Sequence, residues 1–233
     1  MQVLQRLRIV FGKGAELKYI SHLDLLRVWE RALRRARVPL TYSEGFNPRP
    51  KLFFAAALAV GCTGRSEMLD LLLERRVELH EFASALKEQM PDGLQLHDVS
   101  EVELTLPTLS SDVIAAEYEV RILAPDDSGG PQSARSGAIQ ARVDSLLAAT
   151  SIPRQRERPD GARAYDLRPL IQGLQLTGMH GNMVTLGMRL QADAHGTGRP
   201  DEVMAALGMA DRTLSIERTQ LVFRTPEVGQ CVR

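Results

Sequence analysis

The sequence predicts an α+β protein made of two tandem ferredoxin-like domains, each with the split βαβ order of elements. The chain has 233 residues, which is comfortable for two domains of average size. Hydrophobic residues make up 44% of it, enough for two cores. The order strand, helix, strand, strand, helix, strand is predicted once within residues 1–107 and again within residues 113–225. Residues 108–112 are expected to link the two domains.

The first half opens with alternating hydrophobic residues, which predict a strand over 4–10, and residues 17–20 are expected to be extended. A glycine and two prolines make 41–51 a loop. The remaining elements of this half are predicted as strands over 52–59, 67–74 and 94–106 and a helix over 80–90.

A helix is predicted from Ser21 to about Val38. Ser21 is a good N-cap, and Asp24 three positions later favours the positive end of the helix dipole. Pro39 cannot continue the helix. Hydrophobic side chains recur at helical spacing and should face a core: Leu25 or Leu26, Trp29, Ala32, Leu33 and Ala36.

The second half repeats this order. Residues 124–136 are polar and rich in glycine and proline, and 151–161 form a charged loop with three arginines. Strands are expected over 117–123, 183–190 and 214–223, with 164–167 and 174–179 filling the remaining strand position. Helices are expected over 137–149 and 200–208, the latter with Pro200 at its first position and Gly208 at its end.

Charge is distributed unevenly along a chain whose formal net charge is zero. Residues 1–54 contain 11 lysines and arginines against 4 acids, which gives 11 − 4 = +7. Residues 65–103 contain 4 bases against 10 acids, which gives 4 − 10 = −6. The basic end either binds an anion or lies beside the acidic stretch and pairs with it, and both interpretations stay open.

The strongest candidate for a binding site joins the helix and the loop that follows it. Arginines three and four residues apart share the face opposite the core: Arg27, Arg31, Arg34 and Arg35. The loop adds further groups of the same kind: Tyr42, Ser43, Phe46, Asn47, Arg49 and Lys51. Arginines bind phosphates and aromatic rings stack on unpaired bases, so the pattern indicates an RNA or anion surface rather than a merely solvated face.

Other polar residues are weaker candidates. His22 at the helix N-terminus is a general base for RNA cleavage or, more often for a lone histidine, a capping and packing residue, and its partners would have to be Tyr19, Lys18 or Ser43. In the second half, an Asp166–Arg168 pair is expected to fix strand ends, with phosphate contact by Arg168 or Arg218 as a secondary interpretation. Three arginines of the charged loop are expected to be solvated, with contact to a polyanion as the alternative: Arg154, Arg156 and Arg158.

Several kinds of chemistry are not indicated. The sequence contains no P-loop, GxGxxG, HExxH, GxSxG or CxxC motif. Cys62 and Cys231 are too few for an iron–sulfur cluster and have no metal-type spacing. We therefore expect no metal and no cofactor. The first residues lack the apolar core of a signal peptide, and the run 52–62 is too short to cross a bilayer, so a cytoplasmic location without membrane contact is expected.

Three runs resemble the bacterial radical-SAM-linked proteins, a family defined by a domain of unknown function: YISHLD from Tyr19, RALRRARVP over 31–39 and YSEGFNPRPK over 42–51. The resemblance also covers 66–67, 91–93, 166–169 and 218–219, and so spans nearly the whole chain. One departure is Arg49, where many members have histidine, and this weakens any role that needs an imidazole there.

The resemblance implies a partner. Such proteins are fused to, or encoded beside, a cobalamin-binding radical SAM enzyme, often near genes for ribonuclease E/G and ribosomal proteins. It implies work on RNA or the ribosome, but no catalytic residue carries over. We therefore predict an RNA-binding or adaptor protein that works beside that enzyme and is not itself an enzyme. One alternative is a metal-independent endoribonuclease, since the predicted architecture is similar to CRISPR repeat-processing enzymes, and another is a pure protein–protein adaptor.

Overall fold

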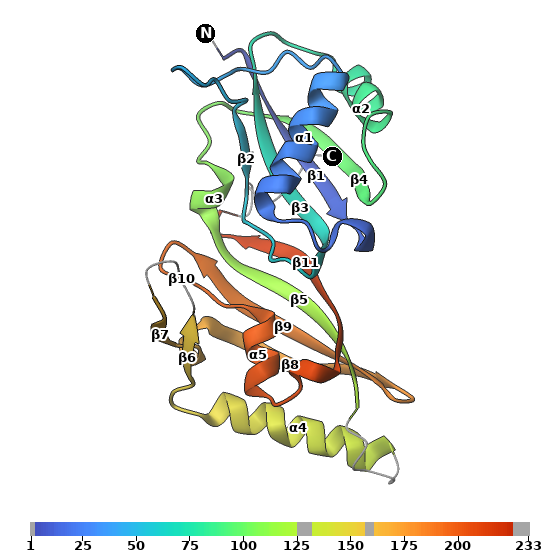
Figure 1. The fold of residues 1–233 in the computed structure, drawn as a ribbon, viewed down its shortest axis with the longest axis vertical. Coiled ribbons are helices and arrows are strands. Elements are labelled where there is room, and N and C mark those ends of the chain that lie inside the picture. The colour runs from blue at the N-terminus through green and yellow to red at the C-terminus, as the bar shows by residue number, and fades with distance from the viewer. Residues whose placement is uncertain (1–2, 125–131, 157–160, 226–233) are drawn as a thin grey trace. The chain divides into compact units, whose positions relative to one another are not determined.

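The computed structural model describes residues 3–124, 132–156 and 161–225. The chain divides into two compact units, one made of Met1–Ile114 with Arg218–Arg233 and the other of Ala115–Glu217. Both contain helices and strands, so the predicted α+β class is confirmed (Figure 1). The domain bounds expected from the sequence stay a prediction.

Four strands and two helices form the body of the first unit. The strands are β1 (Gln5–Lys13), β2 (Leu52–Phe54), β3 (Cys62–Leu73) and β4 (Leu94–Val102). The helices are α1 (His22–Arg35) and α2 (Leu79–Lys87), with the short pieces η1 (Ala15–Leu17) and α3 (Leu109–Asp112). β1 pairs antiparallel with β3 on one side and with β4 on the other, β2 pairs with β3, and the end of β11 (Thr213–Phe223) also neighbours β3.

The core of the first unit lies between α1 and one face of its strands (Figure 1). Trp29 of α1 is fully buried and meets Phe11 of β1 edge to face at 4.9 Å. The other buried side chains of α1 are Leu25, Ala32 and Leu33, as the helical spacing predicts. β1 has neighbours on both sides and both of its faces are covered, so nearly all of its residues are buried.

Local signals explain where α1 begins and ends. The Oγ of Ser21 accepts a hydrogen bond from the amide of Asp24, as the N-cap prediction requires. The helix ends three residues earlier than predicted because Arg37 takes a left-handed backbone conformation, with a φ of 56°. The amides of Arg37 and Val38 then turn back onto the carbonyls of Arg34 and Leu33, the bonding pattern of a Schellman cap.

The second unit is built around three long strands. They are β5 (Val113–Leu123), β8 (Ile171–His180) and β9 (Met183–Asp193), with the first part of β11 and the two-residue β10 (Gly196–Thr197). β9 pairs antiparallel with β5, β8 and β10, and β5 also neighbours β11. The helices are α4 (Gln132–Ala148), which packs against β8, and α5 (Pro200–Ala206), with the short turns η2 (Arg168–Leu170) and η3 (Ala210–Arg212).

Several predicted elements were wrong in kind or extent. Residues 15–17 form a 3₁₀ turn next to the stretch expected to be extended, and 109–112 form a helical turn instead of a plain linker. β2 is only three residues long because the chain leaves the ladder after Phe54. Part of the charged loop is a strand, since β6 (Pro153–Arg156) pairs with β7 (Arg163–Asp166) as a separate two-stranded ribbon. Much of the polar stretch 124–136 lies outside the described residues.

Among the described residues, no helix has both the length and the apolar character needed to cross a membrane.

Candidate nucleic-acid interface

The four predicted arginines of α1 are all exposed, but they differ in what they contact. Arg27 forms an ion pair with Asp24 at 2.8 Å on the first turns of the helix. Arg35 donates to the side-chain oxygen of Gln89 at 3.2 Å and also to its backbone carbonyl. The side chains of Arg31 and Arg34 make no hydrogen bond or ion pair with any residue that the structure describes. The middle of this helix face therefore presents two cations without a carboxylate.

The loop that follows α1 is closed at its base. Tyr42 and Pro50 form an antiparallel bridge, and the amide of Ser43 donates to the carbonyl of Arg49 at 2.8 Å. In return the Oγ of Ser43 accepts from the amide of Arg49 at 3.0 Å. Inside this base, Gly45 has a φ of 117°, which side-chain-bearing residues rarely adopt. The loop is thus held by its backbone, and Ser43 is a residue that shapes it.

The two predicted stacking residues occupy different places. Tyr42 is half-buried and packs against the core of the first unit, so it supports the loop instead of offering a face. Phe46 is fully exposed at the tip, with a relative accessibility of 106%. Asn47 and Arg49 are exposed beside it, and Lys51 is half-buried. Of the two aromatic rings, only that of Phe46 is placed to meet a ligand.

The helix and the loop are close along the chain and in the fold. Five residues separate the end of α1 from Thr41, and Leu40 bridges Leu73 at the end of β3. The loop leaves the unit at the end where α1 finishes (Figure 1). Among the described residues, no hydrogen bond or ion pair joins the arginines of α1 to the loop. The arginines of α1 and the loop are therefore two separate elements of the first unit.

His22 does not have the partners that a role in cleavage was expected to use. Its ring packs edge to face on Phe54 at 5.1 Å, and no hydrogen bond joins it to Tyr19, Lys18 or Ser43 among the described residues. Its Nδ1 is buried without a hydrogen-bond partner there. Burial lowers the pKa of His22, and the nearby Arg218 guanidinium lowers it further, so the imidazole is neutral near pH 7.

A buried group of charges lies next to His22. The Nε of Arg218 donates to Glu67 Oε1 at 2.8 Å, and its terminal nitrogens donate to the carbonyls of Ala56 and Ala57 at 3.0 Å. Lys13 reaches the carbonyl of Cys62 at 3.4 Å, and burial lowers its pKa while the Glu67 carboxylate opposes that change. The three charged side chains are at most 3% exposed. Arg218 therefore stabilises the fold, and the phosphate contact considered for it is wrong.

Part of the excess positive charge of residues 1–54 lies on side chains that are buried inside the protein. Arg6 and Arg8 extend from the face of β1 opposite Phe11, and both donate to the carboxylate of Asp70, with Arg8 Nε at 2.9 Å from Oδ1. Arg6 also donates to the carbonyls of Leu106 and Pro107. These bases pair with the acidic stretch 65–103, as the second interpretation of the charge pattern expects. The arginines of α1 make no ion pair with that stretch among the described residues.

In the second unit, Asp166 and Arg168 both bind backbone groups. One oxygen of Asp166 accepts from the amides of Ile152 at 2.7 Å and Arg168 at 2.9 Å, which lowers the pKa of the carboxyl. The guanidinium of Arg168 donates to the carbonyls of Leu147 and Ile171. Asp166 and Arg168 interact through the Arg168 amide and hold the ends of neighbouring strands, as expected, whereas phosphate contact by Arg168 stays a prediction. Arg154 and Arg156 lie on β6, whereas Arg158 lies outside the described residues.

The described side chains contain no group of three or more His, Cys, Asp and Glu that could hold a metal ion. Sequence reasoning missed Lys13 and Glu67, and their only signal was a charged residue inside an otherwise apolar strand. It also missed Arg163, Tyr165 and His195, which line a pocket in the second unit. Arginines at the alternate positions 154 and 156 form a strand pattern, and this pattern could have indicated the strand at the edge of the pocket.

Three solved structures that are similar to the chain share little sequence with it. A chain of the archaeal box H/ACA sRNP Nop10–Cbf5 complex matches with a TM-score of 0.44 and 13% identity over 92% of this chain. A chain of a Cbf5–Nop10–Gar1 complex matches with a TM-score of 0.45 and 11% identity over 91% of it. The chain spans about half the length of each, 47% and 48%. A protein of unknown function from Galdieria sulphuraria matches with 16% identity over 88% of this chain and 90% of its own, with a TM-score of 0.26.

No curated protein matches the sequence. A family model does match, over residues 6–200, and this range includes α1, the 43–49 loop and most of the second unit. Because the match covers far more than half of the sequence, the chain belongs to the family described as uncharacterized proteins conserved in bacteria (DUF2344).

Proposed function

We propose that this protein binds RNA through the exposed arginines of α1 and the loop 43–49, and that it works beside a radical SAM enzyme. The observation that carries the proposal is the placement of Phe46. Its ring is fully exposed at the tip of a loop whose base is fixed by the Ser43–Arg49 hydrogen bonds. A single exposed apolar side chain is normal on a protein surface. Phe46 supports the proposal because it stands beside the exposed Asn47 and Arg49, so a base that stacks on the ring would also meet a hydrogen-bonding group and a cation.

RNA fits the chemistry of this surface. An unpaired base that stacks on an aromatic ring contributes about 1–3 kcal/mol of binding free energy. Arg31 and Arg34 have no carboxylate partner among the described residues and lie one helical turn apart, a spacing that suits successive phosphates. Sequence-specific RNA recognition mostly targets such unpaired segments, which leaves Asn47 for a base edge.

The partner enzyme, the compartment and the finer fold assignment belong to the same proposal. The runs that resemble radical-SAM-linked proteins include the arginines of α1 and the loop 42–51, which supports a radical SAM partner with a cobalamin-binding domain. A cytoplasmic location follows, because RNA and its modifying enzymes share that compartment. The strand orders β2-β3-β1-β4 and β8-β9-β5-β11 support a ferredoxin-like interpretation of each unit.

A salt-dependent binding measurement tests the RNA surface. A short single-stranded RNA of mixed sequence is titrated in a filter-binding assay at increasing salt, with the wild type and with an Arg31→Glu/Arg34→Glu double variant. Losing two phosphate contacts should reduce the slope of log K against log salt by about 1.4, since each contact to a single strand contributes about 0.7. The matched control is Arg75→Glu/Lys87→Glu, which reverses two exposed charges elsewhere in the first unit and should keep the wild-type slope.

Two results would contradict the RNA proposal. One is a wild-type protein that binds no RNA, and the other is an affinity without a salt slope. In either case, loss of co-purification with the radical SAM enzyme in the Arg31→Glu/Arg34→Glu variant would favour the pure adaptor function.

A second proposal, metal-independent cleavage of RNA, is favoured by one observation. His22 lies at the N-terminus of α1 with a neutral imidazole whose Nδ1 has no hydrogen-bond partner among the described residues, the state that a general base requires, although burial makes it a weaker base than a free histidine. The test is incubation of a structured RNA with the wild type and His22→Ala, without divalent metal. Absence of wild-type cleavage, or equal cleavage by His22→Ala, would remove this proposal and leave the RNA-binding proposal intact.

A further inference from the structure

The ribbon β6–β7 in the second unit gathers cations on one face. In its antiparallel register Arg154 lies opposite Tyr165, and Arg156 lies opposite Arg163. Residues two apart on a strand share a face with their direct cross-strand partners. One face of the ribbon therefore carries three arginines and a tyrosine. Like charges placed directly opposite each other destabilise a pair of strands, so this face has an electrostatic cost unless an anion binds there.

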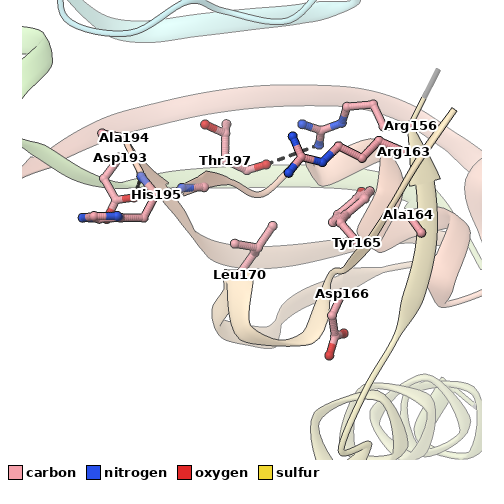
Figure 2. Close-up of a pocket in the computed structure, with 11 residues that line it drawn as sticks. Arg156, Arg163, Ala164, Tyr165, Asp166, Leu170, Asp193, Ala194, His195 and Thr197 are labelled. Atoms are coloured by element: carbon pink, nitrogen blue, oxygen red, sulfur yellow. Dashed lines mark hydrogen bonds between the residues drawn. The ribbon is translucent and has the colours of Figure 1, made fainter. Parts of the chain in front are cut away.

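Two of these arginines line a pocket of about 520 Å³ that lies wholly within the second unit (Figure 2). The ribbon forms one wall with Arg156, Arg163 and Tyr165. His195, in the turn between β9 and β10, and Thr197 of β10 form another wall (Figure 2). A volume of this size is within the usual range for small-molecule sites, roughly 300–1,000 Å³. It is large enough for one nucleotide unit.

Few of the donors in this pocket are used by the protein. Arg156 makes one long hydrogen bond, of 3.4 Å, to the carbonyl of Thr197, and its guanidinium lies 4.9 Å from the ring centre of Tyr165. The side chain of Arg163 makes no hydrogen bond or ion pair with any described residue. The Nε of Arg156 and the hydroxyl of Tyr165 are inaccessible and have no partner there. An unmade hydrogen bond at a buried donor is costly, and a bound acceptor removes that cost.

The two carboxylates of the pocket do not neutralise these arginines. One oxygen of Asp193 accepts from the side-chain nitrogen of Gln191 and from the amides of His195 and Gly196, at 2.8 to 3.1 Å. Asp166 is held by the backbone amides described above, and its side chain points away from Arg156 and Arg163 (Figure 2). Both acids thus shape the backbone around the pocket, and the guanidinium groups keep their charge for a ligand.

We propose that this pocket binds the phosphate group of a nucleotide, with the guanidinium groups of Arg156 and Arg163 donating to its oxygens and the Tyr165 ring forming part of the wall. Guanidinium groups match the geometry of phosphate and form charge-assisted hydrogen bonds with it. The phosphate belongs either to a free nucleotide or to a nucleotide within RNA. All residues of this pocket belong to the second unit, and none of them is part of the surface of α1.

Isothermal titration tests the pocket with the full chain carrying Arg31→Glu/Arg34→Glu, so that the surface of α1 does not contribute. The probes are inorganic phosphate, adenosine 5′-monophosphate and a short oligoadenylate without a terminal phosphate. Each is added up to about 1 mM, the weak end of specific binding. Saturable binding of the monophosphate alone identifies a free nucleotide or a terminal phosphate. Binding of the oligoadenylate identifies an internal phosphate. If inorganic phosphate is the only probe that binds, the pocket is a general anion site and the proposed nucleotide ligand is wrong.

Arg163→Gln is the decisive variant, with Arg121→Gln on β5 as the matched control for an exposed arginine of the same unit. Losing one charged contact should weaken binding roughly 10- to 100-fold. In the absence of ligand, Arg163→Gln should leave Tm unchanged or raise it, because it relieves the repulsion with Arg156. Absence of binding by all three probes, equal binding by Arg163→Gln, or a lower Tm of that variant would overturn the proposal. Such failure would not affect the salt-slope test of α1, which uses other residues.

Discussion

Glu67 and Arg218 lie 151 positions apart in the sequence, yet their side chains form a buried ion pair in the first unit. Two cations share this carboxylate, because Lys13 is buried in the same group. The pair connects the last strand of the chain to β3 and to the backbone of Ala56 and Ala57. Its removal should therefore be among the most damaging changes in the protein.

Glu67→Gln should destabilise the first unit by about 3–5 kcal/mol, because it removes the carboxylate that forms a buried ion pair with Arg218 and lies near the buried Lys13. The measurement is unfolding in urea. The control is Arg76→Gln, which breaks the exposed pair with Glu101 and should cost at most about 1 kcal/mol. A Glu67→Gln protein as stable as that control would mean that the buried group is not ionised as described.

The lowered pKa of His22 predicts how stability changes with pH. Between its ordinary value of 6.5 and the lower value in the folded protein, the unfolded chain binds a proton that the folded chain does not. The free energy of unfolding should therefore fall as the pH drops below about 6.5, and it should level off once the folded imidazole is also protonated. Urea unfolding from about pH 7 to pH 5 should show a smaller loss for His22→Gln than for the wild type. Equal losses would show that other groups account for the dependence.

Phe46→Ala separates binding from folding. The ring is fully exposed, so its removal should leave Tm unchanged, while affinity for single-stranded RNA should fall roughly 5- to 150-fold through loss of stacking. The aromatic control is Phe53→Ala on β2, whose ring is 42% exposed. It should lower Tm and keep the RNA affinity of the wild type. If Phe46→Ala bound RNA as tightly as the wild type, the loop would not be a stacking surface.

Ser21→Ala should cost about 1 kcal/mol of stability, as loss of an N-cap typically does. The serine also donates to the carboxylate of Asp24 at 2.7 Å, and this hydrogen bond is the main cause of the lowered pKa of Asp24. An NMR titration should therefore show the pKa of Asp24 rising toward its ordinary value in Ser21→Ala. Ser21→Asp, which keeps a capping oxygen, should recover most of the stability. An unchanged pKa in Ser21→Ala would show that Arg27 alone holds the carboxylate.

Local signals made α1 predictable from the sequence. Its N-cap, its buried face and the exposed arginines all follow from residues within a few turns of one another. The loop was predictable as a loop, because prolines and a glycine exclude regular structure there. The exposure of Phe46 was not, because the sequence does not show that Tyr42 would fill the nearby core and leave Phe46 outside.

Long-range pairing was the part that could not be predicted. Arg6 and Arg8 alternate with hydrophobic residues, which is typical of a strand with one solvated face. β1 instead lies between β3 and β4, and Asp70 supplies the counter-charge from a position more than 60 residues away. β6 was missed because its arginines suggested a solvated loop, and its cross-strand partner is separated from it by residues without a strand pattern.

The ion pair between Glu67 and Arg218 also has a consequence for biosynthesis. A ribosome completes β1, α1 and β3 long before it adds residue 218, so the growing chain contains the Glu67 carboxylate without its guanidinium partner. During that interval the carboxylate must stay hydrated or take up a proton, and the end of β3 that it occupies cannot close. The end of β3 around Glu67 is thus expected to be among the last parts of the first unit to reach its final packing, although it is synthesised early.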